Sequence, residues 1–373
     1  MKALFVHDHI FIKYNNKYYS KGKFTYSVLS YYLKYCNNLT VIGRFKEVND
    51  MPLDAGLSEG ENIKVIGVPG LLSKNGVLNR TVIKGVIKNE IASSHFVISR
   101  LPSELGLLAN HLANKINKPI LNEMVASPFD CLWYRGDLMA KLYAGILSYK
   151  VKKCLKNAEN VIYVTERYLQ EKYPCTNNVI GISDARVNIS GNIKKLKKDS
   201  KLRIGIIGNP AIKLKGVEVL LRAFNKLSKE KYILSIVGGS LDSTLEKEMS
   251  LNENIEQKGI ISNRDILNEW FLSVDIYIQP SYTEGLPRAV IEAMSFNIPV
   301  IGSDVGGMSE IVNEKNLFKA GDYKSIVNKV LDLNDGNNYI SSSQYSHCIS
   351  KKFTGDLDTR KEAYIQSFIN SIY

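Results

Sequence analysis

Short apolar strands alternate with amphipathic helices along this chain, and the alternation begins a second time after a charged segment. A helix is expected over residues 24–36, because four large side chains fall on one of its faces: Val28, Tyr31, Tyr32 and Tyr35. Strands are expected at residues 2–6, 39–42, 63–66, 96–99, 120–123 and 161–164. Such alternation is typical of parallel sheets covered by helices, so it predicts an α/β fold.

The second series predicts a second domain. Residues 191–200 are polar and rich in lysine, which is typical of a linker. Beyond them we expect strands at residues 202–207, 232–237, 275–279 and 298–301, and helices at 217–228 and 356–371. A chain of 373 residues is long enough for two cores. We therefore predict two facing Rossmann-like domains, residues 1–190 and 191–355, with the ligand site in the cleft at the carboxyl ends of the strands.

The positive charge lies mainly in the first half of the chain. Residues 1–190 carry 25 Lys and Arg against 15 Asp and Glu, whereas residues 191–373 carry 24 against 22, and the whole chain has a net charge of +12. A basic half suits a phosphate-bearing partner or an anionic membrane surface, and a merely solvated basic surface is an equally good interpretation. No dense basic run or nucleic-acid module accompanies the charge, so we expect no nucleic-acid partner.

Cysteine spacing and hydropathy favour a cytoplasmic protein. The five cysteines form no CxxC pair and have no regular spacing, which is typical of reduced thiols. No apolar stretch approaches the roughly 18 uncharged residues of a membrane span, and the first residues lack the apolar core of a signal peptide. No HxxxH or Cys/His cluster suggests a metal site, and none is expected.

Residues 281–294 carry the strongest local signal, because they directly follow the strand expected at 275–279. Pro287 suits the first turn of a helix, where its missing N–H costs nothing. The N–H groups of Gly285 and Leu286 would then be free to bind a phosphate or a sugar hydroxyl. This segment therefore marks a candidate binding loop.

Two carboxylates belong to the same segment. Glu284 lies just before the expected helix and Glu292 about two turns into it. Placed in this way, they can accept hydrogen bonds from the hydroxyls of a sugar and of a ribose. On the spacing alone, a capping glutamate and a surface glutamate of an ordinary helix are an equally good interpretation.

The pair forms an E-x7-E element within EGLPRAVIEAM, and the sequence NIPVIGSDVGG follows. This block, residues 275–311, resembles the donor-site signature of retaining glycosyltransferases of the GT-B fold, family 4 type. More weakly, the segments HDHIF, SRLPSELG and YVTERYLQ resemble bacterial enzymes that build capsule or O-antigen polysaccharides. The resemblance implies that Glu292 binds the nucleotide ribose and that Glu284, a catalytic candidate, contacts sugar hydroxyls. It also implies that the helix in residues 356–373 returns to the first domain.

The family holds the donor diphosphate after the first strand of its second domain. The matching stretch begins at Gly208, and Lys215 matches the family's phosphate-binding lysine, so it is a candidate for both binding and catalysis. Asn209 stands where many members have arginine. Either Lys213 supplies the missing charge, or the asparagine marks a subgroup with different phosphate contacts.

The first domain departs further from the family pattern. The segment YYSKGKF, which stands in place of a glycine-rich loop, keeps only Gly22, whose backbone is a candidate contact for the diphosphate or the acceptor. An aromatic surface loop is an equally good interpretation of this segment. The histidine that many members place near the reacting carbon has no match at its usual place, where only Glu123 offers a catalytic group. Arg100, His7 and His9 are further cleft candidates, although a lone histidine is more often structural.

The resemblance implies transfer of a sugar, with retention, from a UDP- or GDP-sugar to a glycan or a lipid-linked oligosaccharide in surface polysaccharide biosynthesis. It implies no metal and no other cofactor. A lipid-linked acceptor would bring the basic half to the inner face of the plasma membrane, and we expect Tyr18, Tyr19 and Phe24 to be exposed there.

Three other interpretations remain. A GT-B-like nucleotide-sugar 2-epimerase would share the same donor motif. A non-catalytic nucleotide-sugar-binding subunit is favoured by Asn209 and the missing histidine. A Rossmann oxidoreductase is disfavoured, because the glycines at 205 and 208 lack a third partner and the next helix begins too late.

Overall fold

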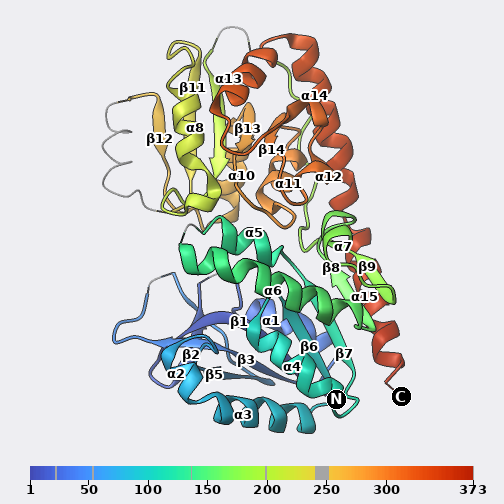
Figure 1. The fold of residues 1–373 in the computed structure, drawn as a ribbon. Coiled ribbons are helices and arrows are strands. Elements are labelled where there is room, and N and C mark those ends of the chain that lie inside the picture. The colour runs from blue at the N-terminus through green and yellow to red at the C-terminus, as the bar shows by residue number, and fades with distance from the viewer. Residues whose placement is uncertain (22, 53, 136, 198–199, 240–251, 373) are drawn as a thin grey trace.

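The computed structural model describes residues 1–21, 23–52, 54–135, 137–197, 200–239 and 252–372. They form two α/β halves, one above the other in Figure 1, each built around its own sheet. The first sheet ends before residue 182 and the second begins after residue 201. Helix α5, Pro128–Trp133, lies on the side of the first half that faces the second.

The first sheet has a parallel core with an antiparallel ribbon at one end. Its parallel strands run in the order β5, β3, β1, β6, β7, β8 and β9. Their bounds are Ile63–Val68, Asn38–Glu47, Lys2–Tyr14, Phe96–Leu101, Ile120–Met124, Asn160–Tyr163 and Asn178–Gly181. Strands β2, Lys17–Ser20, and β4, Gly56–Leu57, pair antiparallel beside β1.

Strand β1 is longer than the strand expected at 2–6, because it resumes after an irregularity. Its register with β3 shifts between Val6 and Ile10, so residues 7–9 leave the regular ladder. The strand then turns into β2, which takes up the first part of the loop expected at residues 18–24. The chain therefore puts a hairpin where the family pattern implies a loop.

Helices cover both faces of this sheet. Leu4 and Val6 of β1 pack toward α3, Arg80–Ser93, and α4, Glu104–Asn114, whereas Ala3 and Phe5 pack toward the opposite layer. Helix α6, Leu138–Lys156, lies beside α4. The opposite layer contains α1, Tyr26–Leu29, the 3₁₀ turn η1, Ser30–Lys34, and α15, Asp356–Asn370. The helix expected over 24–36 is thus a short helical turn followed by a 3₁₀ turn. Short helices α2, Lys74–Leu78, and α7, Tyr168–Lys172, complete the half.

Helix α15 belongs to the end of the chain yet covers the first sheet. The ring of Phe368 lies 5.7 Å from that of Phe96, centroid to centroid. The hydroxyl of Tyr364 donates a hydrogen bond to the backbone carbonyl of Asn178 on β9 at 2.7 Å. The apolar stripe of α15 is therefore buried against the N-terminal half.

The second sheet is wholly parallel over its described strands, in the order β12, β11, β10, β13, β14 and β15. Their bounds are Ile255–Gln257, Tyr232–Val237, Leu202–Ile207, Ile276–Gln279, Val300–Ser303 and Leu317–Phe318. From β10 the chain adds strands on one side and then returns to add β13, β14 and β15 on the other. The strand order therefore reverses between β10 and β13, the place where α/β sheets bind ligands.

The helices of the second half follow their strands. Those in the described ranges are α8, α10, α11, α12, α13 and α14, with bounds Val217–Phe224, Arg264–Ser273, Arg288–Ser295, Met308–Ile311, Tyr323–Asp332 and Gly336–Ser350. Short 3₁₀ turns lie at Lys213–Lys215 (η2), Glu314–Asn316 (η3) and Lys351–Phe353 (η4). Helix α8 ends at Phe224, four residues before the predicted end, and Pro287 lies one residue before α11 as its N-cap.

Candidate active site

The loop after β10 packs directly on the end of β13. Gly216, which lies between η2 and α8, has φ of +64°, and a Cβ at this position would lie 2.1 Å from the carbonyl oxygen of Pro280. The N–H of Tyr282 donates to the carbonyl of Leu214 at 2.9 Å. Glycine at 216 therefore allows the two loops to touch at the point where the strand order reverses.

Lys215 and Glu284 meet at this contact. The Nζ of Lys215 lies 2.8 Å from Oε1 of Glu284, and the carboxylate is largely buried while the lysine is about one-third exposed. The two residues come from loops that follow β10 and β13. The structure thus brings together the side chains that the resemblance assigns to the diphosphate and to the sugar.

A series of hydrogen-bonded, buried polar groups supports the carboxylate of Glu284. Its Oε1 accepts a hydrogen bond from the hydroxyl of Ser281 at 2.7 Å, and Ser281 accepts from the amide of Gln279 at 2.8 Å. Tyr277 donates to the Oε1 of Gln279 at 2.9 Å and accepts from the N–H of Ile207 at 3.1 Å. No motif marks Tyr277 or Gln279, and the only signal in the sequence is polar residues at the end of a buried strand. Because every group in this series has a hydrogen-bond partner, the series fixes the position of the Glu284 carboxylate before any ligand binds.

Glu292 lies apart from Lys215 and Glu284. Its carboxylate, on α11, pairs with Arg264 at the start of α10 at 3.1 Å. Burial, followed by the charges of Glu284 and Glu292, raises the pKa of Tyr277. Arg264, which no sequence motif marks, is therefore the side chain that a ligand hydroxyl would have to displace or share at Glu292.

The loop at Gly285 lies between the two halves. A Cβ on Gly285 would lie 2.3 Å from the carbonyl oxygen of Val125, which follows β7 in the first half. Within the part of the chain that the structure describes, nothing accepts a hydrogen bond from the N–H of Gly285 or of Leu286. Among the described residues, two backbone donors are thus unpaired where the halves meet.

The remaining donor-side candidates have different surroundings. The side-chain oxygen of Asn209 accepts the N–H of Ala211 at 3.0 Å and lies against the backbone of Gly239. Lys213 is exposed at the start of η2. Gly208 directly follows β10, and a Cβ at this position would lie 3.4 Å from the Cβ of Lys215. Asn209 therefore shapes the loop, and Lys213 is the remaining cation that this turn offers beside Lys215.

Glu123 occupies a position unlike the one expected. Its carboxylate is almost fully buried, accepts hydrogen bonds from Tyr32 at 2.9 and 3.0 Å, and pairs with Arg100 at 2.6 Å. Arg100 also pairs with Asp184 at 2.8 Å, and Asp184 pairs with Lys361 of α15 at 3.0 Å. Burial alone would raise the pKa of Asp184, but Lys361 and Arg100 hold it well below its ordinary value. Glu123 therefore belongs to an internal ion network, which is a structural rather than a catalytic position.

His7 and His9 lie in the irregular part of β1. The Nδ1 of His7 is 3.1 Å from the carbonyl oxygen of Arg100, and the Nε2 of His9 is 2.8 Å from the hydroxyl of Ser20. Burial, with the charge of Arg100, lowers the pKa of His7 to about 3, and burial lowers that of His9 to about 4. Both imidazoles are therefore neutral at physiological pH.

The expected exposure of the N-terminal aromatics is wrong for Phe24. Its ring is 8% exposed and lies 5.6 and 4.8 Å from the rings of His7 and His9. Tyr18 and Tyr19 are half-buried. Gly22 lies outside the described residues.

Helix α5 of the first half lies across the donor loop of the second. The ring of Tyr134, which follows α5, stacks on Tyr282 at 5.7 Å between centroids. Burial, together with the charges of Asp130 and Glu284, raises the pKa of the Cys131 thiol to about 11. The candidate site therefore has a wall from each half.

A second contact joins the halves nearby. The carboxylate of Glu310, on α12, accepts the N–H groups of Glu166, Arg167 and Tyr168 at 2.7, 3.1 and 2.7 Å. These three donors lie at and just before the start of α7 in the first half. No motif in the sequence marks this role of Glu310.

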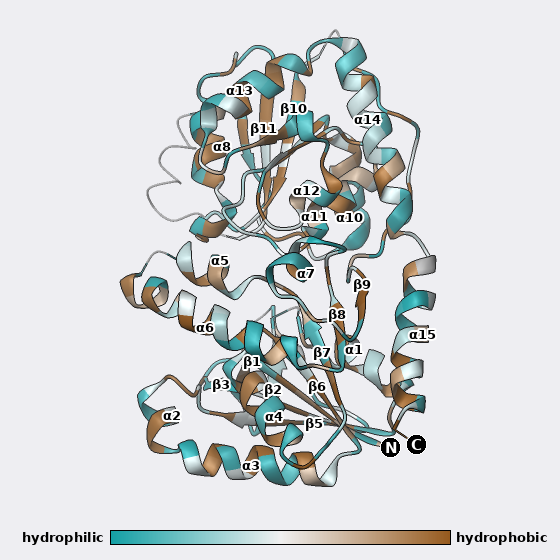
Figure 2. Ribbon diagram, turned by 45° about the vertical axis from the view of Figure 1, so that its right-hand side comes forward, coloured by the Kyte–Doolittle hydropathy of each residue, from teal (hydrophilic) through white to brown (hydrophobic). Residues whose placement is uncertain are grey.

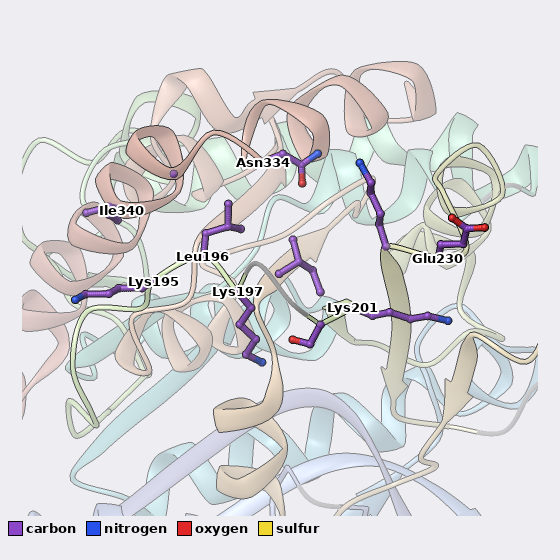
Figure 3. A pocket seen from close by; sticks show the side chains of 11 residues that line it. Lys195, Leu196, Lys197, Lys201, Glu230, Asn334 and Ile340 are labelled. Carbon is purple, nitrogen blue, oxygen red and sulfur yellow. The ribbon is translucent and has the colours of Figure 1, made fainter.

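A cavity of about 920 Å³ lies elsewhere (Figure 3). It opens at the amino ends of β10 and β11, on the edge of the sheet opposite Lys215, and four of its lining residues are Lys195, Lys197, Lys201 and Lys231. Among the described residues, no three His, Cys, Asp or Glu side chains gather as metal ligands. No helix in the described ranges is long and apolar enough to cross a membrane.

Sequence comparisons place these features in a family. Residues 201–335 match the family model "Glycosyl transferases group 1". The chain is 34% identical over 352 residues to protein CapJ of Staphylococcus aureus, covering 92% of this chain and 88% of that protein. It is 24% identical to the putative teichuronic acid biosynthesis glycosyltransferase TuaC of Bacillus subtilis and 29% identical to the O-antigen biosynthesis glycosyltransferase WbnH of Escherichia coli. Each of these two matches covers 52% of this chain, and 51% and 54% of the respective relative.

Solved structures confirm the fold. HepE of Anabaena in complex with UDP and glucose superposes with a TM-score of 0.68, covering 98% of this chain and 100% of that one, at 13% identity. The lipopolysaccharide outer core galactosyltransferase WaaB superposes with a TM-score of 0.64 over 100% of both chains, at 17% identity. The predicted arrangement of two facing Rossmann-like units, GT-B, is confirmed at this level of similarity.

Proposed function

Since the chain belongs to the group 1 glycosyltransferases, we propose that it transfers a sugar, with retention of anomeric configuration, from a nucleotide-diphosphate sugar to a glycan or a lipid-linked oligosaccharide. The relatives named for O-antigen and teichuronic acid biosynthesis support a role in making a surface polysaccharide. HepE, solved with UDP and with UDP-glucose, makes a UDP-sugar the first donor to test, ahead of a GDP-sugar.

The contact between Lys215 and Glu284 carries this proposal. A single ammonium and a single carboxylate, 2.8 Å apart at the switch point of the second sheet, match the two parts of a donor. The leaving diphosphate needs positive charge, which Lys215 supplies, and the sugar needs acceptors for its hydroxyls, which Glu284 supplies. The unpaired N–H groups of Gly285 and Leu286 add two neutral donors beside them. The diphosphate replaces Glu284 as the partner of Lys215 when the donor binds, which releases the carboxylate for the sugar.

The chemical step follows from these positions. The bond between the anomeric carbon and the diphosphate oxygen breaks, and Lys215 stabilises the charge that develops on the diphosphate. The acceptor hydroxyl attacks from the face that the diphosphate leaves, and its proton passes to the leaving phosphate oxygen. We propose this front-face route because Glu123, the first-half carboxylate considered for catalysis, is buried in an ion network and unable to act as a nucleophile. Glu292 accepts hydrogen bonds from the ribose hydroxyls, and its ion pair with Arg264 is broken when the ribose binds.

The test is a turnover assay with a panel of UDP- and GDP-sugars and a lipid-linked acceptor, read by NMR of the product. The expected product keeps the anomeric configuration of its donor, and the reaction continues in EDTA because neither a metal nor another cofactor takes part. An inverted product would overturn retention. A nucleotide sugar epimerised at C2, or nucleotide binding without turnover of any donor, would favour the epimerase or the non-catalytic subunit instead.

A further inference from the structure

Helix α6 carries apolar side chains on two opposite faces. Leu147 and Val151 point into the protein and are buried, as a helix against a sheet requires. Leu142, Ile146 and Tyr149 are 64%, 55% and 67% exposed. At 3.6 residues per turn these three lie within about 60° of one another and roughly opposite Val151. The outer face of α6 is therefore apolar where an ordinary surface helix is polar.

The apolar surface continues past the start of the helix. Leu138 and Met139 in the first turn of α6 are 71% and 75% exposed, and Trp133 at the end of α5 is 43% exposed. Figure 2 shows brown residues on the outer turns of α6, at the side of the first half. We call this set of side chains the α6 patch: Trp133, Leu138, Met139, Leu142, Ile146 and Tyr149. A contiguous set of exposed apolar side chains marks an interaction surface.

The charge of α6 has one sign. The helix contains five lysines and no aspartate or glutamate. The amine of Lys141 lies over the ring of Trp133, 5.6 Å from its centroid. Lys150 reaches sideways to Glu104 on α4, whereas Lys152, Lys153 and Lys156 are exposed. Four lysines thus flank the α6 patch with no acidic partner on the helix itself.

This combination selects among possible occupants. Lysine is depleted at protein–protein interfaces, and the cores of such interfaces avoid charge. A second copy packed symmetrically on the patch would place the five lysines of its α6 against the five lysines of the first copy, and these like charges would repel. A helix with an apolar outer face flanked by lysines instead suits the interface of an anionic membrane, where the apolar side chains enter the headgroup region and the lysines meet lipid phosphates.

We propose that the α6 patch binds the surface of an anionic lipid bilayer. The patch begins at α5, whose neighbour Tyr134 stacks on Tyr282 of the donor loop. A bilayer on α6 therefore lies beside the cleft and presents a lipid-linked acceptor to its mouth. The inference deepens the proposed function, since it assigns the surface on which that acceptor is met. It also replaces Phe24, which is buried, as the apolar contact with the membrane.

The test is flotation of the full chain with vesicles of phosphatidylcholine, with and without phosphatidylglycerol. The parent protein is expected to float with the anionic vesicles and to float less at raised salt. The triple variant L142S, I146S and Y149S should lose at least tenfold in its partition coefficient at any salt concentration. The variant K153Q and K156Q should lose about fivefold per lysine at low salt and little at high salt. The matched control, I266S, L272S and L331S, changes three similarly exposed apolar residues of the second half and should float like the parent.

Two results would overturn the proposal. One is equal flotation of the parent and the α6 triple variant. The other is a parent that does not float but sediments as a dimer which the triple variant dissociates, because that result assigns the patch to a second copy. UDP titration of the same variants keeps this test separate from the proposed function. The α6 variants should bind UDP like the parent, whereas failure of the parent to bind UDP would count against the donor site and leave the flotation result standing.

Discussion

We expect the proposed donor site to depend most on Lys215. In the free protein its ammonium is held by Glu284 at 2.8 Å, so a diphosphate meets a charge that is already in place. Lys215→Ala should weaken both UDP and a UDP-sugar by about ten- to a hundredfold, because both ligands carry the diphosphate and a charged hydrogen bond contributes about 1.5–3 kcal/mol. Calorimetry with each ligand measures this. Lys226→Ala, an exposed lysine after α8, serves as the control and should bind like the parent.

The two glutamates should separate in the same experiment. Glu292→Ala is expected to weaken UDP about tenfold or more, since the ribose belongs to every ligand. Glu284→Ala should leave UDP binding unchanged or slightly tighter, because it frees Lys215, while it lowers turnover of the full donor. If both variants bind and turn over like the parent, the carboxylates are only parts of the ion pairs with Lys215 and Arg264.

His7 predicts a dependence of stability on pH. Its pKa is about 3 in the folded protein and about 6.5 in an unfolded chain, so the unfolded state binds more protons between these values. Stability due to the neutral imidazole is complete above pH 6.5 and is lost as the pH falls toward 3. The parent should lose unfolding free energy when the pH falls from 7 to 5. Over the same range His7→Asn should lose about 1–2 kcal/mol less, measured by urea denaturation. The exposed His111→Asn is the control, and an unchanged pH slope in His7→Asn would contradict the assignment.

At the scale of elements, the contact of α12 with α7 links the two halves. Glu310 accepts three backbone N–H groups that the start of α7 otherwise leaves without partners. Glu310→Ala should lower the free energy of unfolding by about 1–3 kcal/mol, and Glu310→Gln, which keeps one acceptor oxygen, should lose less. Glu314→Ala, an exposed acid in the next turn, should have little effect. Equal stability of Glu310→Ala and the parent would show that water accepts hydrogen bonds from the three N–H groups equally well.

Elements with long apolar runs were predictable, and irregular ones were not. The runs at 202–207 and 232–237 form β10 and β11 with the predicted bounds, because a strand buried on both faces needs a mostly apolar sequence, which only Arg203 and Ser235 interrupt here. Residues 7–9 are polar, so the apolar pattern does not indicate that β1 continues beyond them. The continuation depends on pairing with β3, which the sequence pattern does not show. The glutamate pair was found because its motif is local. The partners of Glu123 lie 91 and 23 residues away in the chain, and no spacing rule connects them.

At the scale of the whole molecule, most of the net positive charge and the exposed apolar face of α6 lie in the same half. The first half carries most of the net charge, and it also carries α6, whose outer face is apolar and basic. Composition alone indicated a basic half, but it left open whether the charge is spread evenly over the surface. The fold adds that five lysines close together in the sequence lie on one helix, which has an apolar outer face and follows α5.

The path of α15 bears on the order in which the molecule can assemble during synthesis. The first sheet is complete in sequence by residue 181, yet the apolar side chains around Phe96 are covered by Phe368 and its neighbours, which are synthesised only after the second half. A nascent chain therefore holds an uncapped core until α15 has been synthesised, while the second half can close earlier. A version ending at residue 355 should accumulate in the insoluble fraction or bind chaperones, and supplying residues 356–373 as a separate peptide should restore part of the soluble yield. Soluble, monomeric protein without α15 would show that the first half closes over its own core.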